Sequence, residues 1–312
     1  MRLRRRPAEP TIAIDPCMGD QQARTFLDAL TRADWPAARE ILARTDHPDD
    51  RAFLLDVAGS APGVQHWIGS VAADDPLAQL VRGCHAVAWA WEARGGYSAQ
   101  YTQQEQFRIF FERLRTAETC LYDVVARTPD EPVAWAFLVR TARGLQLPLE
   151  DGEYRFRQAI ERHSTNLKAH FEWMQTQCEK WSGSHDQMHR FARDAAGYSP
   201  DGSMLHALIP LAHLEVLIDL EGTARRLYIT RPDVQEDLRI AAGLSIWHPA
   251  AEFRPGWPVY LNIFAVAFSQ SGNRPAARAV FERLGDNVTD FPWGYLGGDH
   301  ATNFLKARAA VG

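Results

Sequence analysis

Residues 261–284 read LNIFAVAFSQSGNRPAARAVFERL and hold the clearest structural pattern in the chain. Large side chains and one small one recur at helical spacing up to Phe268. Gly272-Asn273 then interrupts the pattern before Ala277 and Phe281 resume it. Such spacing is typical of two antiparallel helices of a helical repeat, which must stack on similar pairs to bury their apolar face. We therefore expect an all-α chain with no sheet, built as an α-solenoid of antiparallel helix pairs.

The rest of the chain supports this interpretation, because helical periodicity dominates after residue 19 and strand alternation is hard to find. Asp20, Asp34 and Asp75 each precede an apolar periodic stretch as a helix cap would. The middle is the most regular part, and its spacing is close to that of tetratricopeptide repeats. We expect one continuous solenoid, divided as follows: a basic, disordered tail at 1–18, irregular helix pairs at 19–128, regular tetratricopeptide-like repeats at 129–248, and a final repeat with a capping tail at 249–312.

Composition excludes several classes of protein. The net charge of −5 argues against a general nucleic-acid binder, and no helix-turn-helix with a basic recognition helix is evident. No apolar run approaches the roughly 20 residues that span a bilayer, and the basic start lacks the apolar core of a secretory signal. The four cysteines are scattered, as expected of reduced thiols. We expect a cytoplasmic protein with neither a nucleic-acid nor a membrane partner.

The string Trp181-Ser182-Gly183-Ser184-His185 is the most distinctive local motif. Its spacing predicts that Gly183 ends one helix in a left-handed conformation and that Ser184 caps the next. Gln187, three residues further on, would complete a capping box.

A family resemblance rests on this string together with two upstream stretches, Arg143-Gly144-Leu145 and the segment from Trp89 to Gly95, which reads WAWEARG. The chain resembles uncharacterised actinobacterial tetratricopeptide-like proteins, which usually carry Lys-Trp-Gly-Gly-Ser. Here Lys180-Trp181 is followed by Ser182 instead. The resemblance covers residues 20–310 and implies the repeat fold, but it implies no activity.

Motifs of metal binding and catalysis are missing. His185 with His189, and His206 with His213, could share helix faces, yet neither H-E-x-x-H nor E-x-x-H occurs. G-x-S-x-G, P-loop and G-x-G-x-x-G motifs are also absent. We expect no cofactor, no metal ligands and no recognisable catalytic residues, and the sequence favours a protein that is not an enzyme.

The leading functional hypothesis is a binding or scaffold protein that holds a peptide or protein partner in a concave groove. Arg140 and Arg143 fall on one side of their helix, and Lys168 and Gln175 on the next first helix would face the same groove. Three cations and an amide would attract an acidic group on the partner. A simpler interpretation is that the cations pair between repeats with acidic residues, namely Glu150, Asp151 or Glu179.

The alternative hypothesis is a small-molecule-binding protein or a biosynthetic enzyme. Its aromatic and histidine-lined pocket would draw on Trp89, His170, Trp173 and His206. An open groove would favour the peptide partner, whereas a deep cavity would favour the small molecule. The sequence leaves the oligomeric state open.

Overall fold

The computed structural model describes residues 12–95, 103–181 and 183–312. Within these ranges it contains sixteen α-helices and no strand, so the all-α prediction is confirmed. The helices of the first half are α1 (Gln21–Thr31), α2 (Trp35–Ala43), α3 (Pro48–Ala58), α4 (Val64–Ala72), α5 (Pro76–Arg94), α6 (Gln104–Arg127), α7 (Pro132–Gly144) and α8 (Leu149–Arg162). They are followed by α9 (Leu167–Thr176), α10 (His185–Tyr198), α11 (Leu208–Ile218), α12 (Gly222–Ile229), α13 (Pro232–Gly243), α14 (Pro258–Ser271), α15 (Arg274–Leu284) and α16 (His300–Val311), with short 3-10 helices η2 (Met204–Ala207) and η3 (Trp293–Leu296).

Several helices begin at a capping residue. Asp20 caps α1 by accepting the backbone N–H of Ala23, and Asp75 caps α5 by accepting that of Leu77. Proline follows Asp75 at the first position of α5, where its missing N–H costs no hydrogen bond. Each cap satisfies one of the first-turn N–H groups that have no partner inside the helix.

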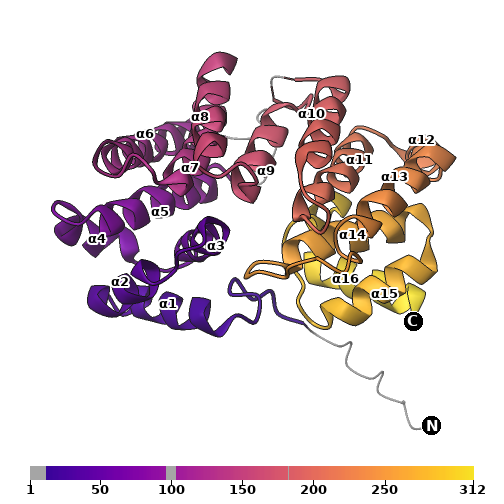
Figure 1. Cartoon of the computed structure of the whole chain (residues 1–312), viewed down its shortest axis with the longest axis horizontal. Helices are drawn as coiled ribbons and strands as arrows, with labels where there is room; N and C mark the ends of the chain where they lie inside the picture. Colours follow the sequence, from indigo (N-terminus) through magenta and orange to yellow (C-terminus); the bar gives the residue numbers. More distant parts are fainter. Residues whose placement is uncertain (1–11, 96–102, 182) are drawn as a thin grey trace, which may run out of the picture.

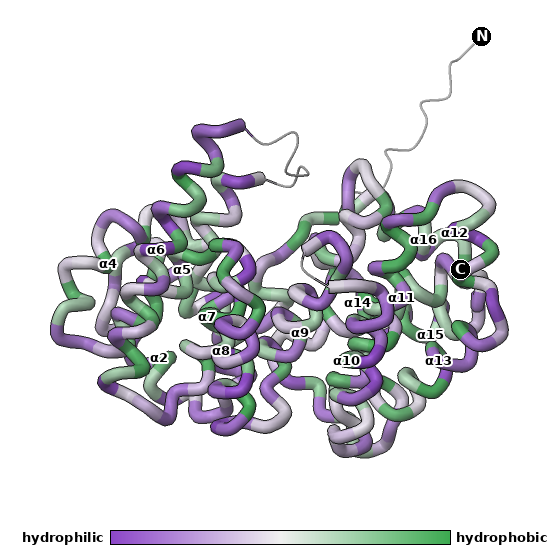
Figure 2. The backbone as a smooth tube through the Cα atoms, turned by 90° about the horizontal axis from the view of Figure 1, so that it is seen from above, coloured by the Kyte–Doolittle hydropathy of each residue, from purple (hydrophilic) through white to green (hydrophobic). Residues whose placement is uncertain are grey.

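Two lobes make up the molecule, and α9 lies between them. Figures 1 and 2 show α1–α8 in one lobe and α10–α16 in the other. The apolar core divides within α9, because Trp173 belongs to the first core cluster and Met174 to the second. Phe191 of α10 packs against both clusters. Two cores that meet at a single helix leave room for a cavity between the lobes.

Several elements differ from the sequence prediction. Helical periodicity predicts one helix over residues 201–221 and the next from residue 231, whereas the structure divides the first stretch into η2 and α11 and adds α12. Periodicity also predicts that stretches 49–59 and 64–73 pair with each other, but α4 packs mainly against α5. The predicted tail extends to residue 18, and its first part, residues 1–11, lies outside the described residues. Residues 12–18 belong to the folded part, since the side chain of Cys17 is fully buried and Asp15 accepts the backbone N–H of Cys17.

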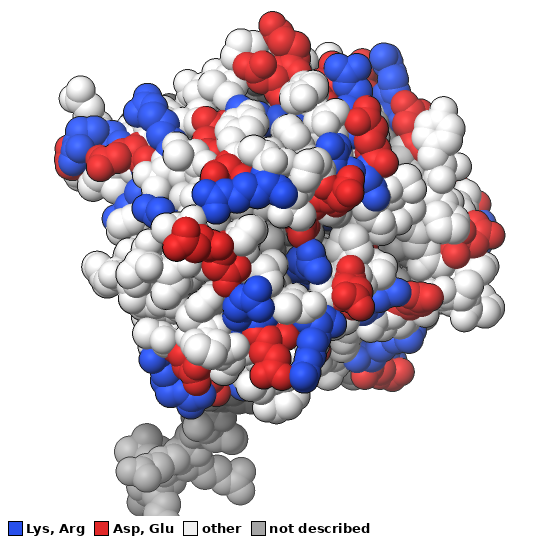
Figure 3. Space-filling view, turned by 60° about the vertical axis from the view of Figure 1, so that its left-hand side comes forward, with Lys and Arg blue, Asp and Glu red and all other residues white. Residues whose placement is uncertain are grey.

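The molecular surface and the cysteines agree with the compositional analysis where the structure describes them. Lysine, arginine and acidic side chains are interspersed on the face seen in Figure 3. All four cysteines are free and buried. None of the helices in the described part combines the length and the apolar character that a bilayer crossing requires.

Ser184 is the N-cap of α10, and its hydroxyl oxygen accepts the backbone N–H of Gln187 at 3.2 Å. The Gln187 side-chain oxygen in turn accepts from the Ser184 hydroxyl at 3.3 Å. The prediction that Gly183 ends a helix is wrong, because α9 already ends at Thr176. Glycine is instead required at position 183 by a close approach, because a Cβ there would lie 1.9 Å from the carbonyl oxygen of Gln177.

Replacing Ser184 with alanine is expected to lower the free energy of unfolding by about 1 kcal/mol, because one first-turn N–H loses its acceptor. Ser184→Gly should cost only a few tenths of a kcal/mol. Urea denaturation of the two variants checks this, and equal losses for both would contradict the capping role.

Candidate functional site

A cavity of about 850 Å³ lies between the two lobes. Its walls come from α3, the end of α7 and α9 on one side, and from the segments 200–204, 250–260 and 289–295 on the other. Sites for small molecules typically enclose about 300–1,000 Å³. The lobes therefore enclose a space of the size that such a ligand needs.

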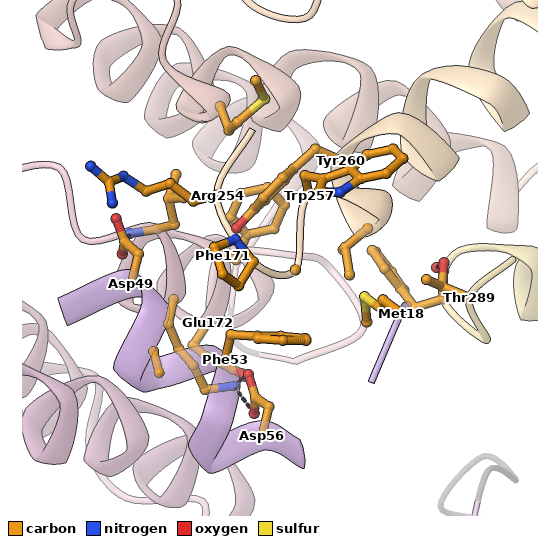
Figure 4. Close-up of a pocket in the computed structure, with 18 of the residues that line it drawn as sticks. Met18, Asp49, Phe53, Asp56, Phe171, Glu172, Arg254, Trp257, Tyr260 and Thr289 are labelled. Carbon is orange, nitrogen blue, oxygen red and sulfur yellow. Dashed lines mark hydrogen bonds and ion pairs between the residues drawn. The ribbon is translucent and has the colours of Figure 1, made fainter. Parts of the chain in front are cut away.

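Aromatic side chains from both lobes form one wall of the cavity. Figure 4 shows Phe53, Phe171, Trp257 and Tyr260 around one open space. The rings of Phe171 and Tyr260 lie 5.4 Å apart. Gly256 lets its loop approach Phe53, because a Cβ there would lie 2.9 Å from the Phe53 ring and the backbone φ is +85°. The second lobe thus completes an apolar surface that the first lobe begins.

The carboxylate of Glu172 lies at another side of the cavity and holds together three cations. It accepts a hydrogen bond from Arg143 at 2.8 Å and one from Lys168 at 3.3 Å, and it lies 3.8 Å from the guanidinium of Arg140. Lys168 also bonds Asp56 at 2.7 Å. Burial would raise the pKa of Glu172, but the three positive charges and the bond from Arg143 lower it to about 2. Glu172 is therefore ionised at neutral pH.

Arg140 is the least engaged cation in the cavity wall. Its only ion pair with a described residue is the 3.8 Å contact to Glu172, and it donates no hydrogen bond to any residue in the described ranges. Its guanidinium lies 5.2 Å from the centre of the Trp91 ring, and 26% of its side chain is exposed. A guanidinium has five N–H donors, so Arg140 can still bind an acidic group that enters the cavity.

The Tyr260 hydroxyl also lacks a hydrogen bond to any residue in the described part of the chain. Burial, followed by the charges of Asp49 and Asp56, raises the pKa of this phenol above its usual value. Tyr260 therefore stays protonated at neutral pH and can donate to a ligand oxygen.

A second buried carboxylate fixes the far end of α9. Glu215 of α11 is 3% exposed and accepts from Gln175 at 2.6 Å and from Lys180 at 2.7 Å. It also accepts from the hydroxyl of Tyr295 in η3. The Gln175 amide is thus engaged, and its role in the wall is to join α9 to α11 and η3.

The structure brings half of the predicted site residues together. Arg140, Arg143, Lys168 and Gln175 all line the cavity. The acidic partner of the cations is Glu172.

The other four predicted residues lie outside the cavity wall. His170 and Trp173 are on the opposite face of α9 and pack on Phe156, with ring centres 5.1 and 5.8 Å away. Trp89 stacks under the guanidinium of Arg113 at 3.5 Å. His206 is 5% exposed in η2, and one ring nitrogen lies 3.4 Å from the Ser199 hydroxyl.

Sequence reasoning missed the aromatic residues and the carboxylate that complete the cavity. Phe171 and Glu172 follow Lys168 by three and four residues, so helical periodicity alone could have placed them on one face with it. Phe53, Trp257 and Tyr260 come from distant segments that carry no shared motif.

The histidines of the predicted pairs form other contacts. His185 bonds Asp219 at 2.9 Å and lies 3.6 Å from Glu179. The rings of His189 and His213 are 4.9 Å apart, with His213 3.2 Å from an oxygen of Asp237. Neither pair lines the cavity.

Comparison with protein-family models, curated proteins and solved structures found no match for this chain.

Proposed function

We propose that this chain is a binding protein for an amphipathic small molecule that carries an acidic group. The acidic group would lie against Arg140, and the apolar body would lie on Phe53, Phe171, Trp257 and Tyr260. The observation that carries this proposal is the unused hydrogen-bonding capacity of Arg140 in the described structure. A carboxylate or phosphate bound there would form charge-assisted hydrogen bonds, which are stronger than neutral ones.

The cavity volume favours a small molecule over a folded partner, since residues of both lobes line this space. A peptide with a free carboxyl terminus is the second candidate. Asp201, Glu252 and Asp290 at the cavity rim are each exposed on more than half of their side chain, and they suit a basic residue next to such a terminus.

The tetratricopeptide-like solenoid is part of the same proposal. Contacts between alternate helices support it, because α1, α3, α5, α7 and α9 each touch the next in that series. Adjacent helices also pack as pairs at α1–α2, α7–α8 and α14–α15. In this arrangement, the alternate helices form the inner layer and present the cavity residues of α3, α7 and α9.

Replacing Arg140 with alanine should weaken the binding of acidic probes at least tenfold, because the acid loses its charged donor. Suitable probes are indole-3-acetic acid and lauric acid, each compared with its neutral primary amide by isothermal titration calorimetry. The amides should bind the variant and the parent chain equally. Binding of the acids should also weaken as salt rises.

Arg157→Ala is the matched control, because Arg157 is exposed on α8 and does not line the cavity. Equal affinity of the acids for Arg140→Ala and Arg157→Ala would overturn the assignment. The assignment would also be overturned if the acids bound the parent chain no better than their amides.

A further inference from the structure

We propose that His47, Asp49 and His163 form a binding site for a divalent transition metal ion at the edge of the cavity. Each residue offers one ligand atom, and these atoms lie within 4.8 Å of one another. The nearest pair, a ring nitrogen of His163 and a carboxylate oxygen of Asp49, is 3.2 Å apart. Two imidazoles and one carboxylate suit zinc and the neighbouring first-row metals.

Local structure fixes all three side chains. His47 caps α3, and its Nδ1 accepts the backbone N–H of Asp49 at 3.2 Å. The other oxygen of Asp49 accepts the N–H of Leu167 at the start of α9. His163 ends α8, and its ring meets that of His47 edge-on at 5.4 Å. Two of the ligands thus come from the start of α3 and the third from the end of α8, so the three meet where these two helix ends lie together.

A neighbouring carboxylate supports this assignment independently. Asp50 Oδ1 is buried and has no hydrogen-bond partner among the described residues, while its Oδ2 accepts from Arg254 at 3.2 Å. The unpaired Oδ1 lies 4.0 Å from Nδ1 of His47. Ligation through Nε2 of His47 would place a proton on Nδ1, which would then donate to this oxygen in place of accepting the N–H of Asp49. Metal-bound histidines commonly donate their second N–H to a carboxylate in this way.

The ion pair between His163 and Asp49 alone would explain two of the three side chains. It would not explain the unpaired oxygen of Asp50. His47 and Asp49 line the cavity, so an ion held by three protein ligands would keep one position open toward it. The proposal is independent of the acidic ligand, because it concerns the metal ion alone.

A second cluster, Glu179, His185 and Asp219, provides an internal comparison. It has one histidine and two carboxylates whose side chains are 63% and 48% exposed. In contrast, Asp49 and His163 are 10% and 19% exposed, and His47 is 31% exposed, like His185. We expect the cluster with two histidines and the less exposed carboxylate to bind the metal ion and the other cluster to remain empty.

To test this, the full chain is first freed of metal with a chelator and is then titrated with Co²⁺. Binding is measured by the visible absorption bands of Co²⁺. We expect one equivalent to bind and Zn²⁺ to displace it. His47→Asn should weaken Co²⁺ binding at least tenfold. Asparagine is itself a preferred N-cap, so this variant removes the imidazole while α3 keeps a cap. Asp50→Asn should weaken Co²⁺ binding about tenfold, because it removes the carboxylate that orients His47.

His185→Asn is the control and should bind Co²⁺ like the parent chain. A thermal melt of each variant establishes that it is folded. The proposal is overturned if the parent chain gives no cobalt bands, or if His185→Asn abolishes them while folded His47→Asn leaves them unchanged.

Discussion

Replacement of Glu172 with alanine is expected to lower the free energy of unfolding at pH 7 by about 3–5 kcal/mol. The carboxylate is 13% exposed and faces Arg140, Arg143 and Lys168. Arg143 and Lys168 are themselves only 8% and 10% exposed. Without Glu172, Arg140 and Arg143 would lose their carboxylate partner and Lys168 would keep only Asp56. Such a loss costs more than the net value of the original pair.

The same carboxylate should make stability depend on pH. Its pKa falls from 4.5 to about 2 on folding, so its contribution is fully present above about pH 5 and is lost as the pH falls toward 2. That shift corresponds to roughly 3 kcal/mol. Glu172→Gln should remove this part of the acid dependence.

Urea denaturation between pH 2 and pH 7 measures both effects. Glu282→Ala is the control, because Glu282 is exposed on α15 and should change stability by less than about 0.5 kcal/mol. If Glu172→Ala proved as stable as this control, the ion cluster would contribute nothing to the fold.

Gly202→Ala should lower the free energy of unfolding by at least about 3 kcal/mol. Gly202 has a backbone φ of +90°, which side chains other than glycine rarely adopt. A Cβ there would lie 2.6 Å from the carbonyl oxygen of Ala250, so backbone would have to move. Both segments line the cavity, and we therefore expect this variant to lose affinity for the acidic probes as well.

Gly197→Ala is the matched control, with the opposite expected sign. Gly197 lies in the last turn of α10, and a Cβ there would meet nothing within 4 Å. Alanine is more favourable than glycine by about 0.5–1 kcal/mol in the middle of a helix, and we expect a gain of the same sign but smaller size in the last turn. Thermal melts of the two variants should shift in opposite directions, and a stabilised Gly202→Ala would contradict the close approach of the two segments.

Local signals predicted most of the helices because caps and periodicity act within a few residues. The pair at 261–284 appears as α14 and α15, with Gly272 in the left-handed conformation at the turn and Asn273 capping the second helix. The split between η2 and α11 could not be predicted, since residues 204–218 are apolar on every side and carry no helical stripe. Burial on all faces removes the periodicity that marks a helix boundary.

Part of the site could be predicted because helical spacing is also a local signal. Arg140 with Arg143, and Lys168 with Gln175, are spaced so that each pair shares a helix face. His170 is only two residues from Lys168, and that offset turns it to the opposite side of α9. Nothing in the sequence brings Phe53 to Gly256, because that close approach depends on how the two lobes meet.

The ion pair between Asp50 and Arg254 joins positions 204 residues apart across the cavity. The ribosome adds Asp50 to the chain long before Arg254, and early segments of a chain begin to fold during synthesis. From the synthesis of Phe171 until that of Gly256, the nascent chain carries Phe53 and Phe171 without the loop that covers them. The proposed ligand site is therefore complete only late in translation, and the half-built aromatic surface is a place where a chaperone could bind first.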